Sequence, residues 1–104
     1  MFGNIAQLMQ QASQIKEKVK DAQHRLESTV VTGEAGGGMV EVSIRGTLDV
    51  HSVVISPQLA ASGDAQMMQT LTQAAIKEAL DKIKVSLKNE FSNVTGGMSL
   101  PGFN

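Results

Sequence analysis

The stretch that decides the fold is MVEVSIRGTLDVHSVVI, residues 39–55. Its first part carries an apolar residue at every second position, the period of a half-buried strand: Val40, Val42 and Ile44. After a break at Gly46 and Thr47, a second β-branched run leads to Ile55. Two such runs around a Gly-containing break predict an antiparallel hairpin. The apolar phase slips near residues 51–52, which predicts a β-bulge there.

A lone hairpin is marginally stable in water, so the rest of the chain must cover its apolar face. Val30, Val31 and Thr32 form the centre of a further predicted strand. A glycine-rich segment, residues 33–38, joins it to the hairpin. This segment lacks a following Gly-Lys-Ser/Thr and leads into a strand instead of a helix, so we interpret it as a flexible strand connection, not a phosphate loop. Its glycines supply positive φ or close backbone approach.

A long helix is predicted before the sheet, from Ile5 to Leu26. Its apolar positions alternate in steps of three and four: Ile5, Leu8, Ala12, Ile15, Val19, Ala22 and Leu26. The first interpretation of this stripe is an amphipathic helix that faces the core. The alternative is a seam against a second helix, from the same chain or from a partner.

A second long helix is predicted from about residue 65 to about residue 94, with Asp64 as its N-cap. Ser56 and Pro57 end the third strand, because Pro cannot donate to a ladder. Residues 58–62 are then a short connector or helical turn. Two glycines at 96–97 stop the helix. Residues 95–104 are expected to be a flexible tail, or to dock Leu100 and Phe103 on a neighbour.

The composition bounds what the protein does. With 104 residues and an apolar fraction of 41%, the chain is expected to be one domain, 1–104. The absence of Cys excludes disulfides and thiolate chemistry, and 3% aromatic residues disfavour a base-stacking binder. We find no signal peptide, no membrane-spanning run, and no catalytic or metal-binding motif. We therefore expect a cytoplasmic protein that is not an enzyme and has no cofactor, metal or small-molecule substrate.

The net charge of −1 conceals an uneven distribution. Eight of the nine Lys and Arg side chains lie in the two helical segments, whereas residues 28–64 hold one Arg and four acidic residues. The ordinary interpretation of such helices is a solvated charged face. The functional interpretation is a surface that contacts phosphates.

The order of these segments is more specific than any one of them. The stretches VTGEAGGGMV, residues 31–40, and TGGMSLPGF, residues 95–103, together with the N-terminal MFG, resemble the YbaB/EbfC family of bacterial nucleoid-associated proteins. The resemblance implies an α+β subunit with a long N-terminal helix, a three-stranded antiparallel sheet and a long C-terminal helix. It also implies a tweezer-like homodimer with projecting helices, which binds double-stranded DNA in the nucleoid and alters its conformation, with roles in nucleoid organisation and gene regulation.

Carried over residue by residue, the resemblance implies DNA contacts from basic residues on both helices: Lys16, Lys18, Lys20, Arg25, Lys77, Lys84 and Lys88. The competing hypothesis is a protein-interaction module, for example a scaffold in recombination or repair, in which the heptad seam and apolar tail recruit another protein. Interleaved acidic residues and the negative net charge favour that alternative.

Overall fold

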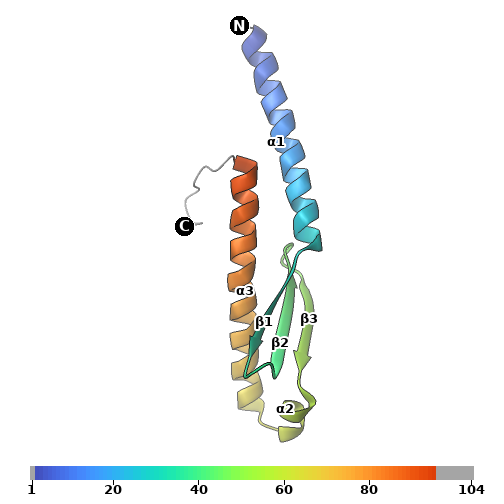
Figure 1. The fold of residues 1–104 in the computed structure, drawn as a ribbon, viewed down its shortest axis with the longest axis vertical. Helices are drawn as coiled ribbons and strands as arrows, with labels where there is room; N and C mark the ends of the chain where they lie inside the picture. The colour runs from blue at the N-terminus through green and yellow to red at the C-terminus, as the bar shows by residue number, and fades with distance from the viewer. Residues whose placement is uncertain (1, 96–104) are drawn as a thin grey trace.

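The computed structural model describes residues 2–95, with side chains from Asn4 onward. The chain is an elongated α+β structure of 72 × 24 × 16 Å (Figure 1). Its elements in chain order are α1 (Phe2–Ser28), β1 (Val30–Ala35), β2 (Val40–Arg45), β3 (Val50–Ile55), α2 (Pro57–Ser62) and α3 (Ala65–Thr95). The α+β class and the element order predicted from the sequence are confirmed.

The sheet is antiparallel with the order β1-β2-β3, and α3 packs across β1 and β2 (Figure 1). Every second side chain of β2 points toward α3, and the contact between the sheet and this helix forms the core. The buried side chains of the core cluster are Val40, Val42, Ile44, Leu59, Ala75, Ala79 and Ile83. The alternation seen in the sequence of β2 is therefore the inside–outside pattern of a central strand.

The predicted irregularity in the third strand is present. Ser43 pairs with Ser52 and Ile44 pairs with Val50, so His51 is the extra residue of a β-bulge. The bulge keeps Val50 and Val53 on the same face of β3, the face that points to the α3 side of the sheet.

The helix start predicted at Asp64 is confirmed, and residues 58–62, expected to be a short connector or helical turn, are helical as part of α2. Pro57 begins α2, where the side chain of Ser56 accepts a hydrogen bond from the Leu59 backbone N–H at 3.1 Å. Asp64 caps α3 by accepting from the Met67 backbone N–H at 3.0 Å.

The connection between β1 and β2 uses glycine as predicted. Gly36, Gly37 and Gly38 all have positive φ, which L-residues rarely adopt. Gly33, within β1, serves a different purpose. It is buried beneath α3, and a Cβ at this position would overlap the backbone of Ala75 and Ala79. Its lack of a side chain sets the close approach of α3 to the sheet.

The core-facing interpretation of the N-terminal stripe is wrong for most of α1. Ala22 is buried and Leu26 is half-buried, but Ile5 and Ile15 are each more than half exposed. The cause is geometric, because α1 runs along only the last part of α3 and does not lie over the sheet (Figure 1). Val19 and Val94 line the same cavity, which places the end of α3 level with Val19. Residues 4–15 therefore lie beyond the end of α3, and Asn4 is about 22 Å past it.

Most of the predicted tail lies outside the described residues. Thr95 is the last residue of α3, and the expected helix stop at residues 96–97 and the tail beyond it are not described.

Candidate nucleic-acid interface

The basic side chains of α1 leave the helix on two flanks. Lys16 and Lys20 are one helical turn apart and share one flank. Lys18 and Arg25 are two turns apart and share the other. Because Lys16 and Lys18 are separated by two positions, their side chains point about 200° apart. All four residues are exposed, but a single flat surface cannot meet both flanks at once.

The three candidate lysines of α3 lie on a single face: Lys77, Lys84 and Lys88. This face is opposite the side that buries Ala79 and Ile83 against the sheet. Asp81 lies among the lysines, 2.9 Å from the Lys77 Nζ and 3.9 Å from the Lys84 Nζ. Hydrogen bonding and attraction to Lys77, with a smaller attraction to Lys84, lower the pKa of Asp81.

Some of the candidate lysines form ion pairs with acidic side chains and others do not. Within residues 4–95, Lys16, Lys18, Lys20 and Lys88 make no ion pair, so their ammonium groups are surrounded by water. The pairs of Lys77 and Lys84 with Asp81 are exposed, and such pairs contribute little to stability, so a phosphate can compete for these lysines.

Arg25 has a partner that sequence reasoning missed. Its guanidinium donates from Nε and Nη2 to the carboxylate of Glu90, with the Nη2 bond at 2.8 Å. The hydrogen bond from Arg25 lowers the pKa of the Glu90 carboxyl and raises the pKa of Arg25 itself. This two-pronged contact joins α1 to α3. No local pattern could have revealed it, because the two residues are 65 positions apart.

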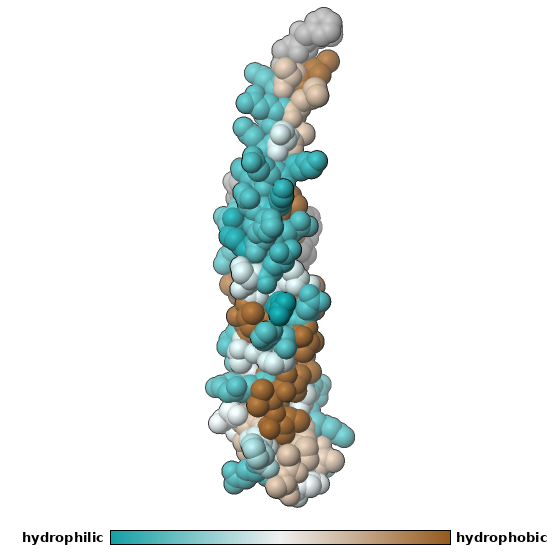
Figure 2. All heavy atoms as spheres, turned by 90° about the vertical axis from the view of Figure 1, so that its right-hand side faces the viewer, coloured by the Kyte–Doolittle hydropathy of each residue, from teal (hydrophilic) through white to brown (hydrophobic). Residues whose placement is uncertain are grey.

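The sequence did not single out an apolar surface that lies beside β3, away from the projecting half of α1. β3 is an edge strand, and α3 covers β1 and β2 but leaves the α3-facing side of β3 open. Val50 is 64% exposed and Val53 is 50% exposed, although their partners in β2 are buried. Figure 2, which looks toward the β3 side, shows apolar side chains gathered over the lower half of the molecule.

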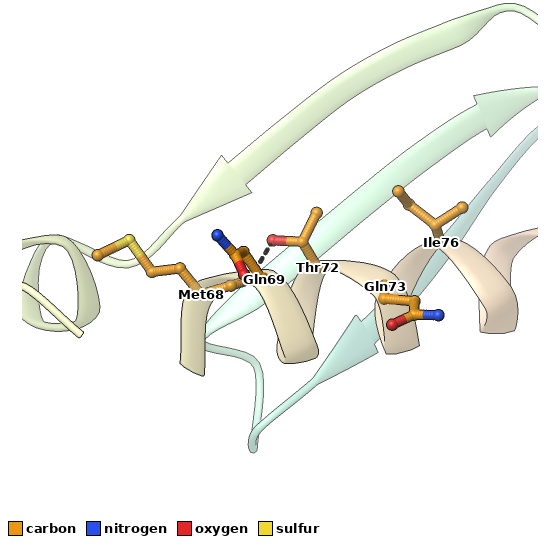
Figure 3. Close-up of a pocket in the computed structure, with 5 residues that line it drawn as sticks. All are labelled: Met68, Gln69, Thr72, Gln73 and Ile76. Carbon is orange, nitrogen blue, oxygen red and sulfur yellow. Dashed lines mark hydrogen bonds between the residues drawn. The ribbon is translucent and has the colours of Figure 1, made fainter. Parts of the chain in front are cut away.

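The helix contributes its own apolar residues to this surface. Lys82 of α3 donates to the Thr32 carbonyl of β1 at 2.6 Å, so the other flank of the helix, with Ile76 and Leu80, is the one nearer β3. A groove of about 430 Å³ runs along α3 here, lined by Met68, Gln69, Thr72, Gln73 and Ile76. In Figure 3, Met68, Thr72 and Ile76 project on the same side of the helix. We call Val50, Val53, Ile55, Ile76 and Leu80 the α3/β3 surface.

Residues 2–95 contain no group of three or more His, Asp or Glu side chains placed to hold a metal ion. None of the helices described is both long enough and apolar enough to cross a membrane.

Comparison with known proteins places the chain among relatives along nearly its whole length. The model of the YbaB/EbfC DNA-binding family matches residues 1–98. A nucleoid-associated protein of Xylella fastidiosa is 44% identical over 101 residues, which cover 97% of this chain and 92% of the relative. A nucleoid-associated protein of Xanthomonas euvesicatoria pv. vesicatoria is 43% identical, with 97% and 93% covered.

The same fold occurs in a crystal structure of the uncharacterized protein HP0035 from Helicobacter pylori. The two structures superpose with a TM-score of 0.78 at 25% sequence identity, covering 88% of this chain and 96% of that one. The overall arrangement of helices and sheet is therefore shared with an experimental structure.

Proposed function

Because the chain belongs to the YbaB/EbfC DNA-binding family, we propose that it is a nucleoid-associated protein that binds double-stranded DNA as a homodimer. In this proposal it contacts phosphates through the basic faces of α1 and α3, changes the conformation of the DNA, and acts in nucleoid organisation and gene regulation. The names of its relatives support a location in the nucleoid.

The observation that carries the proposal is the set of exposed lysines along α1, Lys16, Lys18 and Lys20, which make no ion pair within residues 4–95. A lysine that is not neutralised locally can replace condensed counterions on DNA, and release of those ions supplies much of the binding free energy. The lysines of α3 extend the basic surface, although Lys77 and Lys84 share it with Asp81. Arg25 is included in the proposed site, where its contact with Glu90 also fixes the orientation of α1.

The α3/β3 surface supports the homodimer. Val50, Val53 and Ile55 form an apolar row on an open sheet edge, and such an edge invites pairing with another chain. A second copy would bury this row and the adjoining groove of α3 by two-fold symmetry. Dimerisation would also present two sets of basic helices at a fixed spacing, so the second set would bind with a high effective concentration.

The test is a binding titration of random-sequence double-stranded DNA, followed by fluorescence anisotropy over a series of salt concentrations. The variant Lys16→Ala/Lys18→Ala/Lys20→Ala is expected to bind about tenfold more weakly or worse at low salt. Each lysine that neutralises a phosphate adds about 0.9 to the slope of log affinity against log salt, so the triple variant should make this slope shallower by about 0.9 for every lysine that contacts a phosphate in the complex.

The control is Gln7→Ala/Gln10→Ala/Gln14→Ala, which changes three exposed residues of the same helix without changing its charge. It should keep the affinity and the salt slope of the original protein. The two flanks can then be separated, since Lys16→Ala/Lys20→Ala and Lys18→Ala alter opposite sides of α1. An unchanged affinity of the folded triple lysine variant would contradict the proposed site.

A second candidate function is the protein-interaction module. The apolar stripe of α1 favours it, because Ile5, Leu8 and Ile15 are exposed over a stretch that carries no charge. Absence of DNA binding at low salt, together with intact folding and dimer mass, would favour this alternative.

A further inference from the structure

The projecting half of α1 carries an apolar stripe that no other described residue covers. Ile5 is 55% exposed, Leu8 63% and Ile15 52%, and all lie on the side of the helix that continues to the buried Ala22. The stripe leads directly into a cavity of about 220 Å³ between α1 and α3, whose lining includes the apolar residues Val19, Ala22, Leu26, Leu87, Phe91 and Val94. Cavity and stripe together form a continuous apolar track, which we call the α1 track.

The chain itself supplies a segment that begins at this track. Val94 lines the cavity, and α3 ends one residue later at Thr95. Residues 96–104 follow there, with the sequence GGMSLPGFN. Nine residues can span about 30 Å when extended, whereas the track from Val19 to Ile5 is about 21 Å long. The end of α3 points along the projecting half of α1, so the segment can reach the track without a reversal of the chain (Figure 1).

The chemistry of the two partners matches. Residues 96–104 have no charged side chain and contain three large apolar ones, Met98, Leu100 and Phe103. Residues 4–15 of α1 also have no charged side chain, and the first charge on the helix is Lys16. A charged segment would gain nothing on such a surface. An uncharged apolar segment gains about 25 cal/mol of free energy for each Å² of apolar surface that it removes from water.

We propose that residues 96–104 dock on the α1 track of their own subunit and brace the projecting half of the helix. A helix of about three turns is marginal by itself, so a brace would keep residues 4–15 helical beyond the end of α3. The inference does not depend on DNA binding. It predicts that Leu100 and Phe103 control the local stability of α1.

Spin labelling tests the docking in the full chain, because the protein has no Cys. A nitroxide on Asn104→Cys is expected to broaden the amide resonances of residues 5–15. The same label on Gln58→Cys, in α2 at the far end of the molecule, should leave these resonances unchanged. Adding Leu100→Ser/Phe103→Ser to the labelled protein should abolish the broadening. Absence of broadening from Asn104→Cys would overturn the proposal.

A mixed sample separates the subunit's own helix from that of a second copy. Labelled protein without ¹⁵N is refolded together with unlabelled ¹⁵N protein, so that only contacts between chains can broaden the observed resonances. The proposal expects no broadening of residues 5–15 in this sample. Broadening here would assign the docking to a partner subunit and overturn the inference as stated.

Hydrogen exchange gives an independent readout of the brace. In the full-length variant Leu100→Ser/Phe103→Ser, the amides of residues 8–15 are expected to exchange about tenfold faster than in the original protein. The amides of α3 under the sheet should not change. Ser99→Ala is the matched control, because it alters the same segment without removing an apolar side chain. Equal exchange in all three proteins would overturn the bracing role.

Discussion

Gly33 shows how one residue fixes the distance between two layers. It lies in β1 directly under α3, where a Cβ would overlap the Ala75 carbonyl and the Ala79 backbone nitrogen. Gly33→Ala is therefore expected to push the helix from the sheet and to lower the free energy of unfolding by about 3 kcal/mol. Urea unfolding at a fixed protein concentration measures the change.

Gly37 provides the control for that substitution. It has a φ of +68° but open space around its Cα, so Gly37→Ala tests the cost of the backbone conformation alone. This cost is about 1 kcal/mol. If Gly33→Ala were no more harmful than Gly37→Ala, the close packing of α3 on β1 would not be a constraint on the fold.

At the scale of the elements, α1 is attached to α3 by a charged contact whose strength depends on pH. The bidentate bond from Arg25 lowers the pKa of the Glu90 carboxyl below its usual value of about 4.3. A lowered folded-state pKa means that the stabilisation is fully present above the usual value. It is lost as the pH falls through the lowered pKa. The attachment of α1 should therefore weaken at pH values below about 4.

Carbon-detected NMR titration of the Glu90 side chain measures this pKa directly. The original protein is expected to titrate below the usual glutamate range, and Arg25→Gln should move the Glu90 pKa upward. The thermal midpoint of Glu90→Gln should in turn fall less between about pH 5 and pH 3 than that of the original protein. A Glu90 pKa at or above the usual value would show that the contact does not persist in solution.

The elements also show which parts of the fold local sequence can predict. The alternation of β2, the cap at Asp64 and the bulge near His51 depend on neighbours in the chain, and all three were predicted correctly. The apolar stripe of α1 was recognised, but its environment was not. Whether Ile15 is covered depends on how far α3 runs alongside α1. The two helices are the first and last elements of the chain, so local sequence does not predict how they overlap.

At the scale of the whole molecule, the basic residues and their grouping on each helix were identifiable from the sequence, but contacts between the helices were not. Helical spacing separates Lys16 from Lys18, yet only the structure reveals that Arg25 is engaged by Glu90. The open side of β3 was equally hidden, because β2 and β3 have similar apolar patterns. Only their order in the sheet and the position of α3 distinguish a buried strand from an exposed one.

That open side leads to a prediction about assembly. Val53 and Val54 are adjacent in β3 and almost equally exposed, at 50% and 53%, but they point to opposite faces of the sheet. Val53 belongs to the α3/β3 surface, whereas Val54 lies on the polar face beside Glu41. If the homodimer forms through the α3/β3 surface, Val53→Asp places a charge in the apolar centre of the interface and should shift the protein to the monomer.

Val54→Asp is the matched control, because it introduces the same residue into the same edge strand. Sedimentation equilibrium at several protein concentrations measures the dimer dissociation constant, which should rise at least about 100-fold for Val53→Asp and change little for Val54→Asp. Because the monomer presents one set of basic helices, Val53→Asp should also weaken DNA binding and reduce its salt dependence, although no lysine has changed. A Val53→Asp protein that remains a dimer would place the interface elsewhere, and one that is monomeric but binds DNA normally would separate assembly from DNA binding.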